Sequence, residues 1–311
     1  RGPRLGHARG GGRGAPKDRV WRPLPPRATT PAMSESPRSI LITGCSSGIG
    51  HDAAHGLARR GWRVFATCRA EGDCARLRAE GLESVPLDYQ APETIAAALD
   101  HVLEATGGRL DALFNNGAYA QPGAVEDLPV EALRAIFEAN FFGWHDLTRR
   151  VIPVMRAQGH GRIVQNSSVL GFAALRMRGA YNSTKFAVEG LTDTLRLELR
   201  GSGLHVVLIE PGPVASRIRQ NSRRHYESWI DRDGSHWAGF YRDVVEPRLY
   251  SDAPETDRFE LPASAVTAKL IHALESPRPR ARYYVTTPTY AMGILKRLLP
   301  TSLLDAVLVR G

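Results

Sequence analysis

From residue 39 onward, apolar and polar positions follow two alternating patterns. Short, nearly continuous apolar runs that end at glycine or polar residues predict buried β-strands. Seven segments show this pattern: Ser39–Thr43, Arg63–Thr67, Ser84–Leu87, Leu110–Phe114, Arg162–Asn166, Leu204–Ile209 and Tyr283–Thr286. The longer stretches with helical character are Asp52–Arg60, Pro92–Thr106, Val130–Gln158, with a kink expected near Pro153, and Gly179–Arg200. Strands that alternate with helices predict an α/β domain with a parallel sheet covered on both faces.

One stretch, residues 215–261, lacks the strand pattern and interrupts this alternation. It contains seven aromatic residues among many arginines and aspartates: Tyr226, Trp229, Trp237, Phe240, Tyr241, Tyr250 and Phe259. A long insert of this kind is typical of a lid over a binding site, and its aromatic residues would favour a mostly apolar substrate. An equally open alternative is a surface excursion whose aromatics pack onto the body. An acidic group on the substrate would instead suit its arginines: Arg217, Arg219, Arg223 and Arg224.

Charge is unevenly distributed along the chain. Residues 1–38 hold nine Arg or Lys and two acids, which accounts for +7 of the formal net charge of +9. They also hold seven of the 21 Pro and six of the 30 Gly, so we expect this tail to be disordered. Met33 is a candidate native start, in which case residues 1–32 are not native. Residues 39–311 are close to neutral, and we therefore expect no nucleic-acid partner.

The apolar runs and the cysteines suggest where the protein works. No apolar run approaches the roughly 18 residues that cross a bilayer, so we expect no transmembrane segment. The chain contains an odd number of cysteines without CxxC spacing, namely Cys45, Cys68 and Cys74. This disfavours both a disulfide framework and a metal site. A reducing compartment, hence the cytoplasm, is the default expectation.

A glycine-rich motif, Thr43-Gly44-Cys45-Ser46-Ser47-Gly48-Ile49-Gly50, lies between the first predicted strand and a helix. Glycines there let the backbone approach a pyrophosphate closely, and the helix amino terminus offers N–H groups to it. The second predicted strand leads into Arg69, two residues before Glu71. A basic residue at this place suits the 2′-phosphate of NADP, whereas an acid suits the ribose of NAD. We therefore expect NADP(H) to be favoured over NAD(H), with an ordinary solvated Arg69 as the alternative.

A second motif, Tyr181-Asn182-Ser183-Thr184-Lys185, places a tyrosine and a lysine on one face of a helix. A nearby ammonium stabilises a phenolate, so the pair is a competent general acid/base for a carbonyl or alcohol oxygen. Ser167 and Ser168 follow the fifth predicted strand, where ligands bind in a parallel sheet, and the residues alone do not choose between them. Asn140 is unusual in a helix interior, and its alternative role is a side-chain bond to backbone.

Together these motifs resemble the short-chain dehydrogenase/reductase family, in the form with a TGxxxGxG loop and a YxxxK active site. The resemblance is strong over about residues 39–215 and otherwise architectural. It implies one doubly wound Rossmann domain over residues 39–311, with a parallel sheet of about seven strands. The strings VFATCR, NFFG and IEPGPV are similar to those of 17β-hydroxysteroid and retinol dehydrogenases. The family's catalytic tetrad maps onto Asn140, Ser168, Tyr181 and Lys185, the 13-residue separation from Tyr181 selecting Ser168.

The resemblance also implies how a cofactor is held. The family's NNAG element is present as Asn115-Asn116-Gly117-Ala118, with its last two residues exchanged. Asp88 stands where the family holds the adenine, and Pro211-Gly212-Pro213-Val214 resembles the element beside the nicotinamide. The cofactor-binding residues expected from the motifs and the resemblance are Gly44, Ser46, Ser47, Gly48, Ile49, Gly50, Arg69, Asp88, Asn115, Tyr181, Lys185, Pro211, Gly212 and Val214.

The expected activity is NADP-dependent interconversion of a carbonyl and an alcohol, on a hydrophobic ketone, aldehyde or secondary alcohol. The resemblance implies that Tyr181 is the general acid/base, that Lys185 depresses its pKa and that Ser168 orients the substrate oxygen. Asn140 would hold a water for a proton relay. The resemblance further implies a homodimer or homotetramer. The alternative is a catalytically silent, NAD(P)-sensing regulator on the same fold, which would not consume NADPH.

Overall fold

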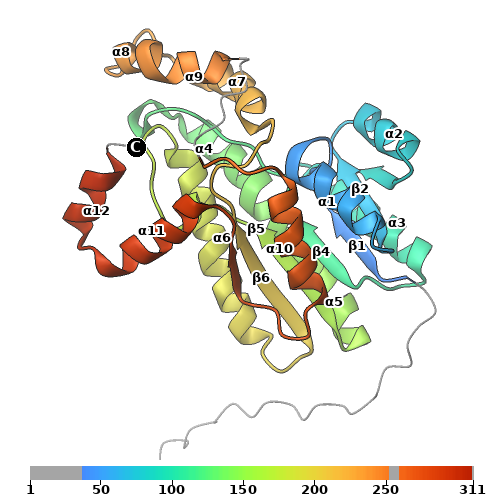
Figure 1. Ribbon diagram of the computed structural model, residues 1–311. Helices are drawn as coiled ribbons and strands as arrows, with labels where there is room; N and C mark the ends of the chain where they lie inside the picture. The colour runs from blue at the N-terminus through green and yellow to red at the C-terminus, as the bar shows by residue number, and fades with distance from the viewer. Residues whose placement is uncertain (1–36, 252–258, 310–311) are drawn as a thin grey trace, which may run out of the picture.

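The computed structural model describes residues 37–251 and 259–309, and these contain a seven-stranded parallel sheet (Figure 1). Its strand order is β3-β2-β1-β4-β5-β6-β7. The strands are β1 Ser39–Ile42, β2 Arg63–Cys68, β3 Glu83–Pro86, β4 Ala112–Asn115, β5 Gly161–Asn166, β6 Leu204–Glu210 and β7 Arg282–Tyr284. All seven predicted strands are confirmed, each within two residues at either end. Residues 1–36 of the predicted tail and 252–258 of the predicted lid lie outside the described residues.

Helices cover both faces of the sheet, as predicted. One layer contains α1 Gly48–Ala58, α2 Glu71–Ala79 and α10 Ser264–Glu275, and the other contains α3 Pro92–Thr106, α5 Gly143–Gln158 and α6 Gly179–Glu198. Successive strand residues point to opposite faces, so Ile40 and Ile42 enter the first core and Leu41 enters the second. The doubly wound architecture follows from strands that are apolar on both sides.

The long helix predicted over Val130–Gln158 is divided, but not at the predicted place. It consists of α4 Val130–Phe137, the π-helical segment η2 Glu138–Phe142, and α5. Pro153 lies inside α5, which continues past it to Gln158. The irregularity lies at Asn140, which is fully buried in η2, and the kink near Pro153 stays a prediction.

The segment after β6, predicted without regular elements, is largely helical. It forms α7 Ile218–Trp229, the short α8 Ala238–Phe240, the π-helical η4 Tyr241–Val245 and α9 Glu246–Tyr250, which lie beyond one end of the sheet in Figure 1. Tyr226, Ile230 and Tyr241 pack into a small core of their own, with Ala124. The Tyr241 hydroxyl accepts a bond from the Ala124 N–H at 2.8 Å and donates to Asp127 at 2.6 Å. Part of the aromatic content of this segment thus anchors it to the loop after β4.

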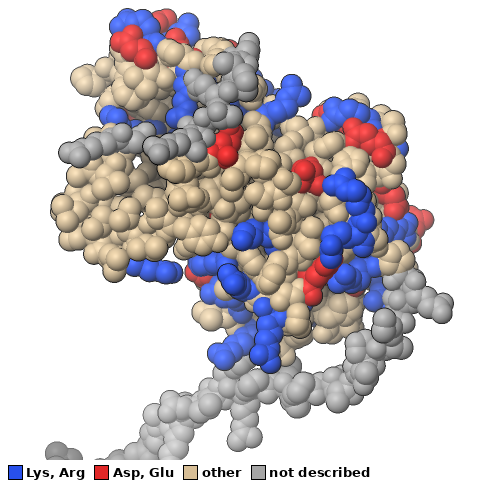
Figure 2. Space-filling model, viewed as in Figure 1, with Lys and Arg blue, Asp and Glu red and all other residues tan. Residues whose placement is uncertain are grey.

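The last two helices, α11 Thr287–Leu298 and α12 Thr301–Leu308, form an arm that extends away from the sheet (Figure 1). Charged side chains are sparse over this arm in Figure 2. Several large apolar side chains of the arm are exposed: Tyr290, Ile294, Leu298, Leu303 and Val307. Within the described ranges, no helix is long and apolar enough to cross a membrane.

Candidate active site

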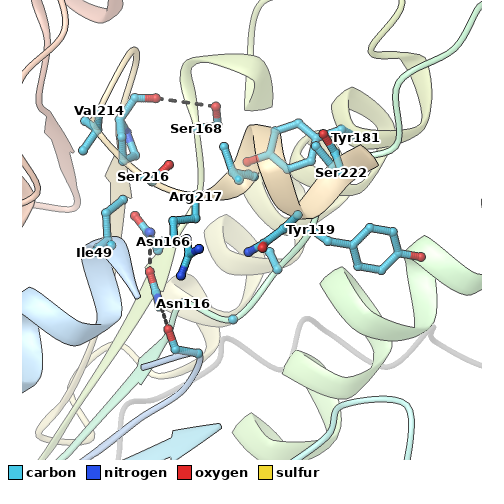
Figure 3. A pocket seen from close by; sticks show the side chains of 18 of the residues that line it. Ile49, Asn116, Tyr119, Asn166, Ser168, Tyr181, Val214, Ser216, Arg217 and Ser222 are labelled. Carbon is cyan, nitrogen blue, oxygen red and sulfur yellow. Dashed lines mark hydrogen bonds between the residues drawn. The ribbon is translucent and has the colours of Figure 1, made fainter. Parts of the chain in front are cut away.

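A cavity of about 440 Å³ opens at the carboxyl ends of the strands, where the strand order reverses between β1 and β4 (Figure 3). Its wall is formed by residues that follow β1 to β6, by α6, and by α7 from the segment above the sheet. Ligands of open α/β sheets bind in this crevice, and the volume lies in the usual range for small-molecule sites.

The glycine-rich loop forms one wall of the cavity. Gly44 and Gly48 adopt φ values of +69° and +58°, which favour glycine. A Cβ at Gly44 would lie 2.5 Å from the Cα of Gly117, so no larger residue fits there. Ser47 is the N-cap of α1 but its side chain makes no capping bond, which leaves the first N–H groups of the helix available. This cradle fits the pyrophosphate of a dinucleotide.

Gly50, also expected to contact the cofactor, does not line the cavity. A Cβ at Gly50 would lie 2.3 Å from the carbonyl oxygen of Gly44. The third glycine of the motif therefore lets α1 pack closely on its own loop, and its contribution to binding is indirect.

A hydrogen-bonded network fixes the floor under this loop. The Thr43 Oγ1 accepts the N–H of Asn116 at 2.9 Å and of Gly117 at 3.1 Å. The Tyr89 hydroxyl also lies 2.7 Å from the same oxygen. One buried threonine thus joins β1 to the loops after β3 and β4 and holds the cavity floor in place without a ligand.

Asn115 and Asn116 take different positions in this floor. Asn115 is fully buried, where its amide donates to Thr148 at 3.0 Å and accepts from Tyr89 at 2.7 Å. It does not line the cavity, so its expected contact with the cofactor stays a prediction. The next residue, Asn116, lines the cavity and donates to the Thr43 carbonyl at 2.9 Å (Figure 3). The wall position belongs to Asn116 because successive residues at a strand end point to opposite sides.

Two arginines meet at another part of the cavity wall. Arg69 and Asp88 follow β2 and β3, and Arg224 comes from α7. Burial lowers the pKa of Arg224, and the positive charge of nearby Arg69 lowers that pKa further, while Asp88 raises it. The segment above the sheet therefore brings a second guanidinium toward Arg69. The sequence had suggested Arg224 only as one of several arginines that would suit an acidic group on the substrate.

Tyr181 and Lys185 share one face of α6 and open onto the same cavity as the glycine-rich loop. The Lys185 Nζ donates to the Asn166 carbonyl at 2.8 Å. It also lies 4.4 Å from the ring centroid of Trp144 and 5.5 Å from that of Tyr181. The ammonium and the phenol are thus neighbours in one buried site.

Ser167 and Ser168 both line the cavity, close to Tyr181. Ser168 Oγ accepts the Leu170 N–H at 3.1 Å and makes a long bond of 3.5 Å to the Pro211 carbonyl (Figure 3). Among the described residues, the buried Ser167 hydroxyl has no hydrogen-bond partner. The structure brings both serines to the site and gives Ser168 a weak bond that a ligand oxygen can replace.

Burial dominates the ionisation of this wall. It raises the pKa of Tyr181 to about 12, although Ser168 and the positive charge of Arg178 lower it. It lowers the pKa of Lys185 to about 7, although Glu189 raises it. Both groups are thus driven toward their neutral forms. Desolvation is the largest effect on both pKa values, and the depression of the Tyr181 pKa by Lys185 stays a prediction.

The chain matches the family model described as short chain dehydrogenase over residues 38–227. It belongs to the short-chain dehydrogenase/reductase family. It is 39% identical over 271 residues to "Uncharacterized oxidoreductase YbbO" of Escherichia coli (strain K12), covering 87% of this chain and 94% of that protein. It is 34% identical over 282 residues to 17-beta-hydroxysteroid dehydrogenase type 6 of Rattus norvegicus, covering 86% and 87%. The solved structure of a short-chain dehydrogenase/reductase from Burkholderia phymatum, in complex with NAD, superposes with a TM-score of 0.70 at 27% identity, covering 85% and 92%.

In this short-chain dehydrogenase/reductase, Asn140 lies behind the cavity wall. Its Oδ1 accepts the Tyr119 N–H at 3.1 Å, and its Nδ2 donates to the Tyr119 carbonyl at 2.8 Å. The alternative of a side chain bonded to backbone therefore describes its contacts, and a proton relay through Asn140 stays a prediction. Its bonds fix Tyr119, which lines the cavity and stacks on His225 of α7 with ring centroids 3.8 Å apart.

Sequence reasoning missed Arg178, which lines the cavity three residues before Tyr181. The available signal was its place at the start of the helix that carries the tyrosine. Arg178 is the N-cap of α6, so its side chain begins beside the first turn of that helix.

Proposed function

We propose that this protein is an NADP(H)-dependent oxidoreductase that interconverts a carbonyl and an alcohol, with Tyr181 as the general acid/base. The observation that carries the proposal is the convergence of Ser168, Tyr181 and Lys185 on the cavity that the glycine-rich loop lines. The oxidoreductase and dehydrogenase names of the relatives support the reaction class.

The residues along the cavity fit a dinucleotide from end to end. Ser46–Ile49 would hold its pyrophosphate at the start of α1, and Asp88 would meet the adenine. Pro211, Gly212 and Val214 would flank the nicotinamide. The bound nicotinamide supplies or accepts the hydride, and the protein's own residues handle the proton.

Ser168 would donate its hydroxyl hydrogen to the substrate oxygen and release its long bond to Pro211. Tyr181, with a pKa raised to about 12 in the free protein, is protonated at neutral pH and ready to donate to a carbonyl oxygen. Lys185 keeps the end of β5 fixed through Asn166 and places its side-chain nitrogen close to the phenol.

The preference for NADP is supported by Arg69 and Arg224. The positive charge of Arg69 lowers the pKa of Arg224, and an anion between the two guanidinium groups, as the 2′-phosphate would be, would stabilise both. The Burkholderia structure contains NAD, so the family fold alone does not set this preference. The ratio of kcat/KM for NADPH and NADH, measured with the same substrate, tests it, and a ratio below one refutes the NADP assignment.

The substrate is proposed to have an apolar body. Apolar side chains line the cavity around Ser168 and Tyr181, among them Val169, Leu170, Leu175, Val214 and Ile218. We propose α7 as part of a lid, because it contributes to the wall of the cavity opposite the sheet.

A panel of ketones, aldehydes and secondary alcohols, assayed with each cofactor, tests the function as a whole. Steady NADPH consumption with a carbonyl, or NADP⁺ reduction with an alcohol, is expected. Tight NADPH binding without turnover on any compound of the panel would favour the silent regulator instead.

Two further properties complete the proposal. The exposed apolar arm of α11 and α12 supports a homodimer or homotetramer, which light scattering after size-exclusion chromatography tests.

The three described cysteines are buried free thiols, which supports a reducing compartment such as the cytoplasm. Fractionation of cells that express the protein tests the compartment.

A further inference from the structure

The cavity wall is strongly basic. Six arginines line it, against the two carboxylates of Asp88 and Glu260: Arg69, Arg178, Arg217, Arg219, Arg224 and Arg248. Arg69 and Arg224 lie near Asp88, at the part of the cavity proposed for the adenosine. Arg178 instead lies beside Tyr181, so a dinucleotide phosphate does not account for it.

The backbone around Arg178 is held rigidly. Met177 has a φ of +60°, which is unusual for a residue other than glycine, and its carbonyl accepts the Gly123 N–H at 3.0 Å. The carbonyl of Arg178 accepts the Asn182 N–H at 2.8 Å as α6 begins. Strained, fixed backbone is found where a side chain has to be placed accurately.

The charge of Arg178 is left without a partner. The residue is half-buried, and no hydrogen bond or ion pair engages its guanidinium among the residues that the structure describes. Burial lowers the pKa of Arg178 to about 10, and the positive charge of Arg248 lowers it further. Even a partly buried cation is more stable when an anion pairs with it, and the nearest titratable groups include two further arginines and a phenol.

We propose that Arg178 is the anion-binding residue of the substrate subsite, and that the substrate joins an oxyanion group, such as a carboxylate, to the carbonyl or alcohol through an apolar chain. The oxyanion accepts hydrogen bonds from the Arg178 guanidinium while the reacting oxygen meets Ser168 and Tyr181. Leu170, Leu175 and Val169 line the same cavity and suit the apolar chain. The identity of the compound as a substrate rests on the proposed function, but the binding of its anion to Arg178 does not.

Binding to the NADP⁺-loaded protein tests the subsite without turnover. Octanoate, octanesulfonate and octyl phosphate carry three kinds of oxyanion on one chain, and octanamide is the neutral match. We expect at least one of the anions to bind on the order of 10- to 100-fold more tightly than octanamide, by isothermal titration calorimetry. The order among the anions identifies the head group, and equal binding of octanamide and of all three anions overturns the proposal.

Arg178→Met keeps the length of the side chain and removes the charge. The variant is expected to lose the preference for the anion over octanamide, while Arg178→Lys retains part of it because a single ammonium lacks the guanidinium fork. Arg134→Met, on the exposed face of α4, makes the same chemical change outside the cavity and should leave the preference intact. Unchanged anion preference in Arg178→Met would contradict the proposal.

Stability and kinetics give independent readouts. In the ligand-free protein, Arg178→Met is expected to raise Tm or leave it unchanged, because it removes an unpaired buried charge; a lower Tm would point to a structural ion pair and against the proposal. With an ω-oxo acid and its primary amide as substrates, the wild type should favour the acid through KM, and the variant should not. Turnover of no compound of the carbonyl and alcohol panel, alongside Arg178-dependent octanoate binding, would refute the proposed function and leave the subsite standing.

Discussion

The floor of the cavity and its wall beside Tyr181 are both rich in polar side chains, but they differ in how many of these side chains have hydrogen-bond partners. In the floor, Thr43 joins the backbone of Asn116 and Gly117 to β1 through hydrogen bonds of 2.9 and 3.1 Å. In the wall, the Ser167 hydroxyl and the Arg178 guanidinium have no partners among the described residues, and the Ser168 hydroxyl donates only a long bond of 3.5 Å to Pro211.

This difference separates groups that build the site from groups that wait for a ligand. A completed network stabilises the fold and positions the phosphate cradle before any cofactor arrives. Polar groups that are buried and unpaired cost stability and are retained where a ligand will satisfy them. The two kinds of group should therefore respond in opposite ways to mutation.

Tyr181→Phe probes the wall where the reacting oxygen would lie, and we expect the largest effect there. Removal of a positioned general acid/base lowers turnover by roughly 10²–10⁴-fold. NADPH binding, followed by its fluorescence, should change little. Tyr290→Phe, on the exposed arm, serves as the matched control, and near-wild-type turnover in Tyr181→Phe would remove the tyrosine from the mechanism.

Thr43→Val probes the floor. The valine keeps the shape of the side chain and leaves the N–H groups of Asn116 and Gly117 without their acceptor. We expect the free energy of unfolding to fall by about 2–4 kcal/mol, measured by denaturant titration without cofactor. Thr194→Val, whose hydroxyl bonds only within exposed helix surface, should cost less than about 0.5 kcal/mol. Equal stabilities for the two variants would mean that the floor is not pre-built.

Arg69→Asp probes whether the cavity wall near Asp88 is also completed by a ligand. Reversal of this charge should lower the NADPH-to-NADH ratio of kcat/KM by about 10- to 100-fold, since charged hydrogen bonds to the 2′-phosphate are lost. Arg200→Asp, outside the cavity, is the control for net charge. An unchanged ratio in Arg69→Asp would leave Arg224 or no arginine as the determinant.

Lys185→Met probes the wall through the pH dependence of stability. The folded-state pKa of Lys185 is lowered to about 7, below the unfolded value of about 10.4, so the unfolded chain binds more protons between these values. The free energy of unfolding should therefore increase as pH rises from about 7 to 10. The same contribution of Lys185 should be lost as pH falls back from about 10 to about 7. Glu210, with its pKa raised to about 8, titrates in the same window. The slope is therefore taken as the difference between wild type and Lys185→Met, and no difference would show that Lys185 stays charged.

The fold was largely predictable because it depends on local patterns. Apolar runs specify the strands whether or not their neighbours are known, and the strand–glycine–helix order at Gly44–Gly50 specifies the dinucleotide turn. The π-helical segment at Asn140 was not predictable, since it depends on the bonds to Tyr119 from a distant loop. The helices between Ile218 and Tyr250 escaped prediction because polar arginines and histidines occupy much of their surface.

The candidate site was predictable to the extent that single motifs contain it. Tyr181 and Lys185 share a helix face, and this spacing is visible in the sequence. The sequence did not predict that Asn116, rather than Asn115, lines the cavity, because this depends on which way each side chain leaves the end of β4. Arg178 carries no motif, and its significance follows only from burial without a partner.

The ring stack between Tyr119 and His225 holds α7 against the cavity, and the Tyr241 hydroxyl, bonded to Ala124 and Asp127, ties η4 to the loop after β4. A dinucleotide therefore meets a partly closed entrance on arrival and again on departure. The rate at which these contacts open would then limit how fast the cofactor is exchanged. Once exchange is slower than the chemical step, a faster chemical step would not raise turnover.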